Sequence, residues 1–380
     1  MNRFVVFISV VLAIYALMNF VAFKWFRFMF HFSGKALVVV FWLIMLTQPL
    51  GQFLMSTRPG KIAAAIIQIG YVWLGLLFYF TLLGIVTKVF TLIIRKTFAN
   101  HSTPVAIEKL DSGFPTAGSI ILVILTISVG VGFVRAWKPI VRNVTVSLPL
   151  QIKNPLTIVQ LSDLHLDELR SVKWWESIVD RTLALNPDVI VLTGDNIDEN
   201  PGRLERFKPG LKRLSASYGV FAITGNHEFF TDTSAMAVLL EECGIKLLRN
   251  QVYTIPEVAC IIGIDDPTGI SIAGQSRPDF SELGRSVPSD IPVIALNHQP
   301  VYLQQIAEMG AHIQLSGHTH NGQLRPFDFF TRLMFPYNNG YYNVDGLHLY
   351  VSSGTGIWGP PFRIGTVSEI IELQIISSAS

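Results

Sequence analysis

Two histidines stand one residue apart in the segment Gly317-His318-Thr319-His320. The alternating residues 311–316 before them are typical of a β-strand, and Gly317 allows the chain to turn where that strand ends. Such a turn would aim both imidazoles into one pocket, and imidazole is the commonest metal ligand in proteins. Two surface histidines in a glycine-rich turn would give the same short pattern, so other segments of the chain must decide between the two interpretations.

Four further segments share this build, a short apolar run followed at once by Asp, Asn or His. They are residues 156–161 before Asp163 and His165, residues 189–192 before Asp195 and Asp198, residues 220–223 before Asn226, His227 and Glu228, and residues 293–296 before His298. In open α/β sheets, ligands bind outside the carboxyl ends of the strands. We therefore expect the polar side chains of all five segments to meet at one sheet edge and to form a site.

The side chains in these segments are oxygen and nitrogen donors, which suit Mn, Fe, Zn or Mg. Seven candidate ligands are too many for a single tetrahedral ion. A two-metal cluster needs a bridging carboxylate, and Asp195 is the natural candidate because it lies in the middle of the motif series. Two metals about 3.5–4 Å apart can hold a bridging hydroxide and clamp both the attacking and the leaving oxygen of a phosphoryl group.

The order and spacing of these motifs resemble the calcineurin-like metallophosphoesterase superfamily over roughly residues 150–375. The matching motifs are Asp163-x-His165, Gly194-Asp195-x-x-Asp198, Gly225-Asn226-His227-Glu228, His298 and Gly317-His318-x-His320. The ending His320-x-Gly322-Gln323-x-Arg325 resembles a bacterial branch whose members are often membrane-attached. One departure is Asn321, where that branch would have glycine.

The resemblance implies a four-layer α/β/β/α sandwich, two divalent metal ions with manganese favoured, and a role for each residue. One metal would be bound by Asp163, His165, Asp195 and His320, and the other by Asp195, Asn226, His298 and His318. His227 would bind no metal, but would stabilise the transition state or protonate the leaving group.

For other polar residues in and near the motifs, the sequence supports less specific expectations. Asp198 and Glu228 are expected to support the ligands or to form turns. Arg325 and Arg363 could bind a substrate phosphate through paired hydrogen bonds, or could form surface salt bridges, and the sequence does not favour either role. The two cysteines, Cys243 and Cys260, have no metal-type spacing, and two buried thiols are favoured over a disulfide.

The chain divides by composition. Of its 380 residues 50% are hydrophobic and only 15% charged, which is too apolar for an ordinary soluble protein. Residues 1–140 carry twelve Lys or Arg and two acids, whereas residues 141–380 carry seventeen and twenty-five. A basic, apolar first part suits membrane spans beside anionic lipid. Nucleic-acid binding fits poorly, because these basic residues punctuate apolar runs and do not line one face.

Four apolar runs are long enough to cross a bilayer as helices, at residues 4–23, 36–55, 62–87 and 116–133. A signal peptide is the alternative for the first run, but that run is long and more spans follow it. Basic residues divide six against seven between the two faces, so they do not set the orientation. Because no acid or histidine falls within a span, we expect an anchor and not a transport pathway.

We therefore predict a transmembrane anchor at residues 1–140, a linker at residues 141–155 and a mixed α/β catalytic domain at residues 156–380. Helices are expected at residues 174–185, 204–214, 234–243 and 301–309. Further strands are expected at residues 251–255, 260–264, 347–351 and 368–375.

The expected function is a multi-pass, membrane-anchored phosphoesterase, placed by the resemblance in a bacterial cell membrane and acting on a phosphate mono- or diester. Attachment to a lipid bilayer makes a phospholipid or a nucleotide-linked lipid a candidate substrate. A catalytically inert scaffold that binds partners is the alternative, although no ligand of the pattern is missing. Residues 327–342 are rich in aromatic side chains and are expected either to lie in the core or to rest on the bilayer as a loop.

Overall fold

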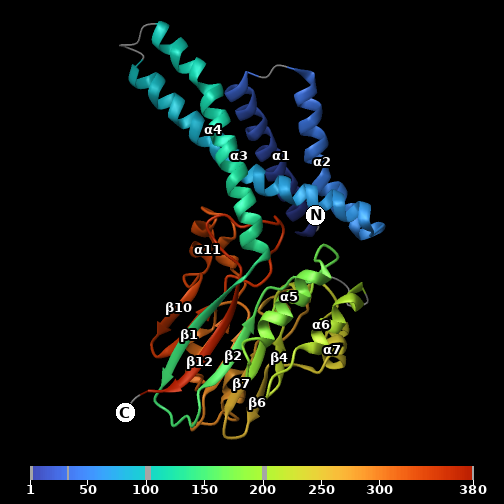
Figure 1. Cartoon of the computed structure of the whole chain (residues 1–380), viewed down its shortest axis with the longest axis vertical. Coiled ribbons are helices and arrows are strands. Elements are labelled where there is room, and N and C mark those ends of the chain that lie inside the picture. Colours follow the sequence, from blue (N-terminus) through green and yellow to red (C-terminus); the bar gives the residue numbers. More distant parts are fainter. Residues whose placement is uncertain (1–2, 32–33, 99–103, 199–202, 379–380) are drawn as a thin grey trace. The chain divides into compact units, whose positions relative to one another are not determined.

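Four long helices occupy the first part of the chain, and two β-sheets with their covering helices occupy the rest (Figure 1). The computed structural model describes residues 3–31, 34–98, 104–198 and 203–378. These residues form two compact units. The helical unit comprises the described residues up to Val131 together with Gly359–Phe362, and the α/β unit comprises the described residues from Gly132 to Trp358 and from Arg363 onward.

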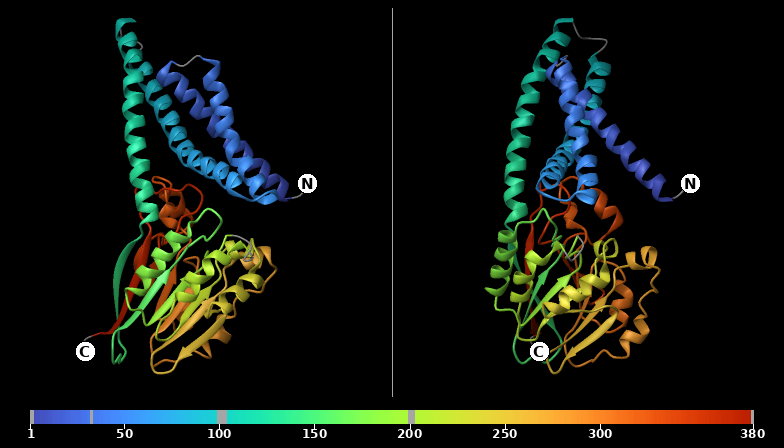
Figure 2. Two further views of the ribbon diagram at one scale, coloured as in Figure 1. Left: turned by 45° about the vertical axis from the view of Figure 1, so that its right-hand side comes forward. Right: turned by 90° about the vertical axis from the view of Figure 1, so that its right-hand side faces the viewer.

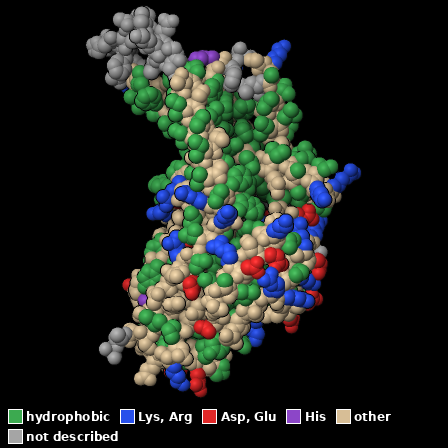
Figure 3. Space-filling view, viewed as in Figure 1, with side chains coloured by type: hydrophobic (Ala, Val, Ile, Leu, Met, Phe, Trp, Pro, Cys, Tyr) green, Lys and Arg blue, Asp and Glu red, His purple; other side chains and the backbone are tan. Residues whose placement is uncertain are grey.

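The helical unit contains α1 (Arg3–Phe30), α2 (Lys35–Thr57), α3 (Lys61–Phe98) and most of α4 (Pro104–Trp137). Each helix is long and apolar enough to cross a membrane, with candidate spans Ser9–Phe30, Val38–Thr57, Lys61–Ile94 and Phe114–Trp137. Pro115 lies inside α4, which still runs as one long rod (teal in Figure 2). The visible surface of these helices is largely hydrophobic (Figure 3), as lipid contact requires. The four predicted spans thus correspond to four helices.

Helices α2 and α3 pack closely at two glycines. A Cβ atom on Gly51 would lie 2.6 Å from Cα of Ile67, and one on Gly70 would lie 2.6 Å from Cα of Gln48. In a membrane the hydrophobic effect does not drive helices together, because lipid tails are as apolar as the side chains. Helices associate there by close packing, which small residues such as glycine allow. Glycine is therefore required at both contacts.

The α/β unit contains two six-stranded sheets, with strand orders β1-β12-β2-β3-β4-β5 and β10-β11-β9-β8-β7-β6. The strands of the first sheet are β1 (Ile140–Leu148), β12 (Glu369–Ser377), β2 (Leu156–Leu161), β3 (Val189–Thr193), β4 (Val220–Ile223) and β5 (Ile245–Leu247). Those of the second are β10 (Gly340–Val344), β11 (Leu347–Val351), β9 (Ile313–Ser316), β8 (Val293–Asn297), β7 (Ala259–Ile264) and β6 (Gln251–Ile255). All five strands expected to deliver polar side chains are parallel neighbours within these sheets: β2, β3 and β4 in one, β8 and β9 in the other.

Strand β1 departs from the sequence-based prediction. Residues 141–155 were expected to form a linker, but residues up to Leu148 belong to β1, which pairs in parallel with β12 over nine positions. Its partner lies more than two hundred residues further along the chain, so no local pattern reveals the pairing. The first strand of the α/β unit therefore follows α4 almost at once, because only two residues separate Trp137 from Ile140.

The core of the α/β unit has three apolar layers. Inward-facing side chains of both sheets, such as Ile158, Val191 and Ile294, form the central layer. The helices α5 (Val172–Leu183), α6 (Lys208–Arg213) and α7 (Thr233–Glu242) cover the outer face of the first sheet (Figure 1). Helices α9 (Phe280–Gly284) and α10 (Leu303–Glu308) cover the second sheet, and α8 (Thr268–Ile272) lies at the edge near β7. This is the four-layer α/β/β/α arrangement, so the predicted fold class is confirmed.

One helix lies where the sequence suggested a loop. Helix α11 (Asp328–Met334) follows the His-x-His segment after the short turn His320–Gly322. The predicted helices otherwise correspond to α5, to α6 with the turn Glu205–Phe207 before it, to α7 and to α10.

Candidate metal centre

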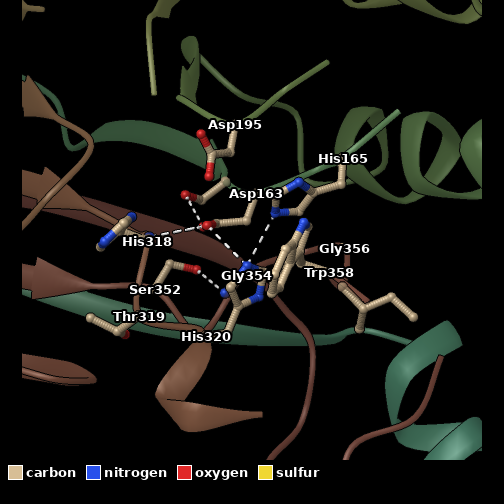
Figure 4. A network of polar contacts seen from close by, with 12 residues as sticks. Asp163, His165, Asp195, His318, Thr319, His320, Ser352, Gly354, Gly356 and Trp358 are labelled. Carbon is tan, nitrogen blue, oxygen red and sulfur yellow. Dashed lines mark hydrogen bonds and ion pairs between the residues drawn. The ribbon is translucent and has the colours of Figure 1, made fainter. Parts of the chain in front are cut away.

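The five strand ends meet at one edge, where their polar side chains form three overlapping groups of possible metal ligands. Of their members, Figure 4 shows Asp163, His165, Asp195, His318 and His320. The groups are Asp163, His165 and His320; His165, Asp195 and His227; and Asp195, His298 and His318. Within each group the ligand atoms lie within 4.8 Å of one another. The structure thus brings together six of the seven ligands proposed from the sequence, with His227 beside them, from both sheets.

The first group is held at short distances. Nε2 of His165 lies 3.1 Å from Nε2 of His320, and the latter atom lies 3.3 Å from Oδ1 of Asp163 (Figure 4). Two ring nitrogens can approach this closely only if one carries a proton or if both bind a cation between them. Asp163 is fully buried, and its Oδ1 also accepts a hydrogen bond from the backbone N–H of His318 at 3.0 Å.

The group of Asp195, His298 and His318 is built around the Asp195 carboxylate. Its Oδ2 lies 3.1 Å from Nε2 of His298, whose Nδ1–H donates to the carbonyl oxygen of Thr193 at 2.8 Å. A backbone bond at one ring nitrogen fixes the tautomer and leaves the other nitrogen as an acceptor, as in most histidine metal ligands. Oδ1 of Asn226 is buried and has no hydrogen-bond partner among the described residues. Leaving an acceptor in this state is costly, and a bound cation would satisfy it.

The backbone is strained at most of these positions. Five of the seven proposed ligands have a positive φ, namely Asp163, His165, Asp195, His318 and His320. Each such conformation costs roughly 1–3 kcal/mol in a residue other than glycine, and it persists only where the surroundings enforce it. The loop after β3 and the loop after β4 also approach each other too closely for a side chain at Gly225, where a Cβ atom would lie 2.2 Å from Oδ1 of Asp195.

Burial and neighbouring charges set the protonation of the site. Burial lowers the pKa of His318 to about 3 and, with the nearby His165, holds the pKa of His320 well below its ordinary value. Burial alone would raise the pKa of Asp195, but the charge of His298 and its hydrogen bond hold that pKa well below its usual range. Neutral His318 and His320 and an ionised Asp195 are in the forms that bind metal ions. For His298, by contrast, burial would lower the pKa, but the charge of Asp195 and its hydrogen bond outweigh burial and raise this pKa well above its ordinary value.

Asp198 holds two histidines through one oxygen. Its Oδ1 accepts hydrogen bonds from Nδ1 of His165 at 2.8 Å and from Nδ1 of His227 at 3.0 Å. Nε2 of His227 lies 3.9 Å from Oδ2 of Asp195, which is too far for a hydrogen bond. Burial would lower the pKa of His227, but the hydrogen bond to Asp198 and the charge of Asp195 outweigh it and raise this pKa to about 9.

Glu228 ties two loops of the site together. Its buried carboxylate accepts hydrogen bonds from the backbone N–H groups of Gly225 and Asn196, each at 2.6 Å, and from those of Asp195 and Ile197 at 3.1 and 3.2 Å. Burial raises the pKa of this carboxyl to about 7. Glu228 therefore positions the loop after β3 against the loop after β4, as the sequence-based expectation of a supporting role required.

The two arginines lie in different surroundings. Arg363 is fully buried, and it donates to the carbonyl oxygens of His320 at 3.0 Å, Ser353 at 2.6 Å and Gly356 at 3.0 Å. Its guanidinium is thus enclosed beneath the His320 turn, so neither role considered from the sequence, phosphate binding or a surface salt bridge, fits Arg363. Arg325 has a side chain that is half exposed and lies 3.7 Å from Asp328, so it stays a candidate for binding substrate.

Asp266 is a buried residue of the site that the sequence analysis missed. It follows β7 as the other polar residues follow their strands, and its Oδ1 accepts a hydrogen bond from Nε2 of Gln299, the neighbour of His298. Burial raises the pKa of Asp266, and the charge of His298 opposes this shift. The same signal, an apolar run followed at once by Asp, is present at residues 260–266 and would have found it.

Comparison with known proteins identifies the family. The family model of calcineurin-like phosphoesterases matches residues 156–322. A transmembrane protein with metallophosphoesterase domain from Danio rerio is 31% identical over 339 residues, which are 85% of this chain and 76% of that protein. The chain belongs to the metallophosphoesterase family.

Two further comparisons add to this picture. A metallophosphoesterase of Campylobacter jejuni is 33% identical over 62% of this chain, and the match spans 63% of that protein's length. Among solved structures, a dimetal phosphatase from Danio rerio has a TM-score of 0.39 and 13% identity, covering 59% of this chain and 100% of that one. The latter similarity is too low to add to the family assignment.

Proposed function

We propose that this metallophosphoesterase is a membrane-anchored enzyme that hydrolyses a phosphate mono- or diester at a centre of two divalent metal ions. The observation that carries the proposal is a chain of overlapping ligand groups. His165 links the group of Asp163 and His320 to Asp195, and Asp195 in turn belongs to the group of His298 and His318. Family membership supports the reaction class, and the geometry supports the residues.

The residues present fit two metal ions. Asp163, His165, Asp195 and His320 would hold one ion, and Asp195, Asn226, His298 and His318 the other. The unpartnered Oδ1 of Asn226 supports this set, as does the buried Nε2 of His298, which lies 3.1 Å from Oδ2 of Asp195. The donor types suit Mn, Fe, Zn or Mg, and manganese is the ion we favour. When bound, such a pair supplies Lewis-acid activation of water and neutralises the charge of the phosphoryl oxygens.

His227 is the proposed proton donor to the leaving oxygen. Its Nδ1 is held by Asp198, so Nε2 is the atom that faces the centre and can give a proton. The side chain of His227 is 20% exposed, whereas that of His298 is fully buried, so His227 is the histidine that an incoming substrate can contact. Hydrolysis breaks one P–O bond, with the hydroxyl of water joining phosphorus and a proton joining the leaving oxygen.

The four candidate spans support an integral membrane location. The helices expose large hydrophobic side chains along their length, which suits lipid and not water. A bacterial cell membrane is the location we propose, in line with the sequence resemblance.

The deciding experiment uses the full chain purified in detergent and loaded with Mn²⁺. Hydrolysis of p-nitrophenyl phosphate and of bis(p-nitrophenyl) phosphate would be measured beside metal content, with Asp195→Asn as the matched inactive variant. We expect metal-dependent turnover of at least one ester that is lost in Asp195→Asn. A chain that binds both metals but hydrolyses neither ester, nor any of a panel of mono- and diesters, would instead be the inert scaffold.

A further inference from the structure

Exposed apolar side chains gather in one segment of the α/β unit, which we call the α11 lobe (residues 325–339). Phe329, Leu333 and Met334 are 61%, 69% and 73% exposed, and none of the seven described residues of α11 is buried. A helix that belonged to the core would bury at least one face. The lobe is therefore an apolar surface patch, which in a soluble protein usually marks a binding site for protein or membrane.

The lobe is fastened to the metal centre at both ends. At its start, the backbone of Gly322 meets that of α11 so closely that a Cβ atom would lie 2.4 Å from the N atom of Asp328. At its far end, Asn321 exchanges side-chain hydrogen bonds with Asn338 at 3.1 Å and with Asn339 at 3.2 Å. Asn321 is the position at which the sequence departs from its family pattern, and this contact gives the departure a structural role.

Aromatic rings extend this apolar surface to His318, a proposed metal ligand, and to His227, the proposed proton donor. Phe335, at the end of α11, has its ring centroid 5.0 Å from that of His318. Trp358 and Phe230, which are 54% and 62% exposed, lie 5.9 and 6.0 Å from the ring of His227. The side chain of Gln323, beside the lobe, donates to the carbonyl of Trp358 at 2.9 Å and so joins the two parts.

Two observations indicate what covers this surface: the charge of its exposed arginines and the short chain segment between α4 and β1. The side chains of Arg325 and Arg332 are 52% and 58% exposed, and each lies 3.7 Å from Asp328. Exposed arginines among apolar side chains suit the headgroup region of an anionic bilayer. The fourth candidate span ends at Trp137, and β1 begins at Ile140. An extended chain of that length reaches only about 10 Å, so β1 begins within that distance of the end of the fourth candidate span.

We propose that the α11 lobe docks on the lipid bilayer and that the substrate of the metal centre is a phosphoester carried on a lipid. This substrate class rests on the proposed phosphoesterase function, whereas the docking does not. The apolar chains of the lipid would stay with the lobe and the rings of Trp358 and Phe230, while the phosphoester reaches His227 and the metals.

Docking can be measured without turnover. The full chain, reconstituted in vesicles of phosphatidylcholine and phosphatidylglycerol, would carry an environment-sensitive fluorophore at Met334→Cys or at Val238→Cys. Val238 is also exposed, at 55%, but lies on α7, and the native Cys243 and Cys260 are buried. We expect lipid-borne quenchers to quench the label at position 334 and to leave the label at position 238 bright. Equal quenching at the two positions would overturn the docking.

The substrate class is tested by a ratio of two activities. Phosphatidic acid and phosphatidylglycerol in vesicles serve as a lipid monoester and diester, and the two nitrophenyl esters serve as soluble counterparts. In the triple variant Phe329→Ser, Leu333→Ser, Met334→Ser, the ratio of lipid to soluble turnover should fall at least about tenfold, because three inserting side chains are lost. The control Val238→Ser with Ile272→Ser removes exposed apolar side chains elsewhere and should keep the ratio.

The outcomes separate the two proposals. If the unmodified chain hydrolyses soluble esters but neither lipid, or if the triple variant keeps the ratio, the lipid substrate is wrong while the phosphoesterase stands. A joint fall of both activities with the melting temperature would place the lobe in the core and would also overturn the inference. If no ester of either kind is hydrolysed, the proposed function fails, and the quenching result still decides the docking.

Discussion

Oδ1 of Asp198 lies 3.0 Å from Nδ1 of His227 and holds this imidazole through a hydrogen bond. The same oxygen lies 2.8 Å from Nδ1 of His165. One carboxylate therefore orients both a proposed metal ligand and the proposed proton donor. Asp198 is therefore a positioning residue, and its loss should affect both metal binding and proton donation by His227.

Replacing Asp198 by alanine should weaken metal binding about 10–100-fold, the usual cost of losing a group that orients a histidine ligand. The turnover that remains at saturating metal should also be reduced, because His227 loses its hydrogen bond. Mn²⁺ titration and steady-state kinetics measure the two effects. The control is Asp180→Ala, since Asp180 is 62% exposed and pairs with Arg213 at the surface. Wild-type metal affinity in Asp198→Ala would contradict the assignment.

Asp195 and Asn226 should differ in how many metals they hold. Asp195→Asn is expected to weaken both metal positions together, because this carboxylate is proposed to bridge them, whereas Asn226→Ala should weaken mainly one. Metal content after dialysis, measured by mass spectrometry, separates the two patterns. Two tightly bound metals per chain in Asp195→Asn would rule out the bridge.

His227→Ala should keep its metals and lose turnover. A positioned general acid is typically worth about 10²–10⁴-fold, and the loss should be larger for esters with poor leaving groups, which need the proton most. Comparing nitrophenyl and alkyl phosphoesters at equal metal occupancy tests this. If the variant loses a metal instead, His227 is a ligand and its proposed role is wrong.

Glu228→Ala should destabilise the α/β unit itself. Removing the carboxylate leaves buried N–H groups of two loops without an acceptor, at roughly 1–3 kcal/mol for each group, so a loss of at least about 3 kcal/mol is expected. Thermal unfolding of the metal-free chain would measure it, with the exposed Glu241→Ala as the control. Equal melting temperatures of the two variants would show that Glu228 does not join the loops.

The fold and the place of the site were predictable because both rest on local patterns. Short apolar runs followed by Asp, Asn or His mark strand ends, and parallel strands bring those ends to one edge, so residues as distant as Asp163 and His320 could be expected to meet. The distances within the site agree with that expectation. The assignment of each side chain to a particular metal stays a prediction.

Features that depend on tertiary burial were not predictable in this way. Arg363 and Arg325 are chemically alike, yet one is enclosed by backbone carbonyls and the other is half exposed. The helical form of residues 328–334 was missed because flanking Pro and Asn residues indicate a loop, although the residues between them favour a helix. Strand β1 was missed because its pairing partner is remote in sequence.

The place of β12 between β1 and β2 has a consequence for synthesis of the chain. β1 is made directly after the fourth candidate span, but it pairs with β12, and β12 in turn pairs antiparallel with β2. More than two hundred residues must leave the ribosome before β12 can enter this gap, which takes on the order of ten to forty seconds at about 5–20 residues per second. During that time the edges of β1 and β2 that later pair with β12 have no partner strand. Until β12 closes the sheet, these edges are open to pairing with strands of other chains, which is a route to aggregation.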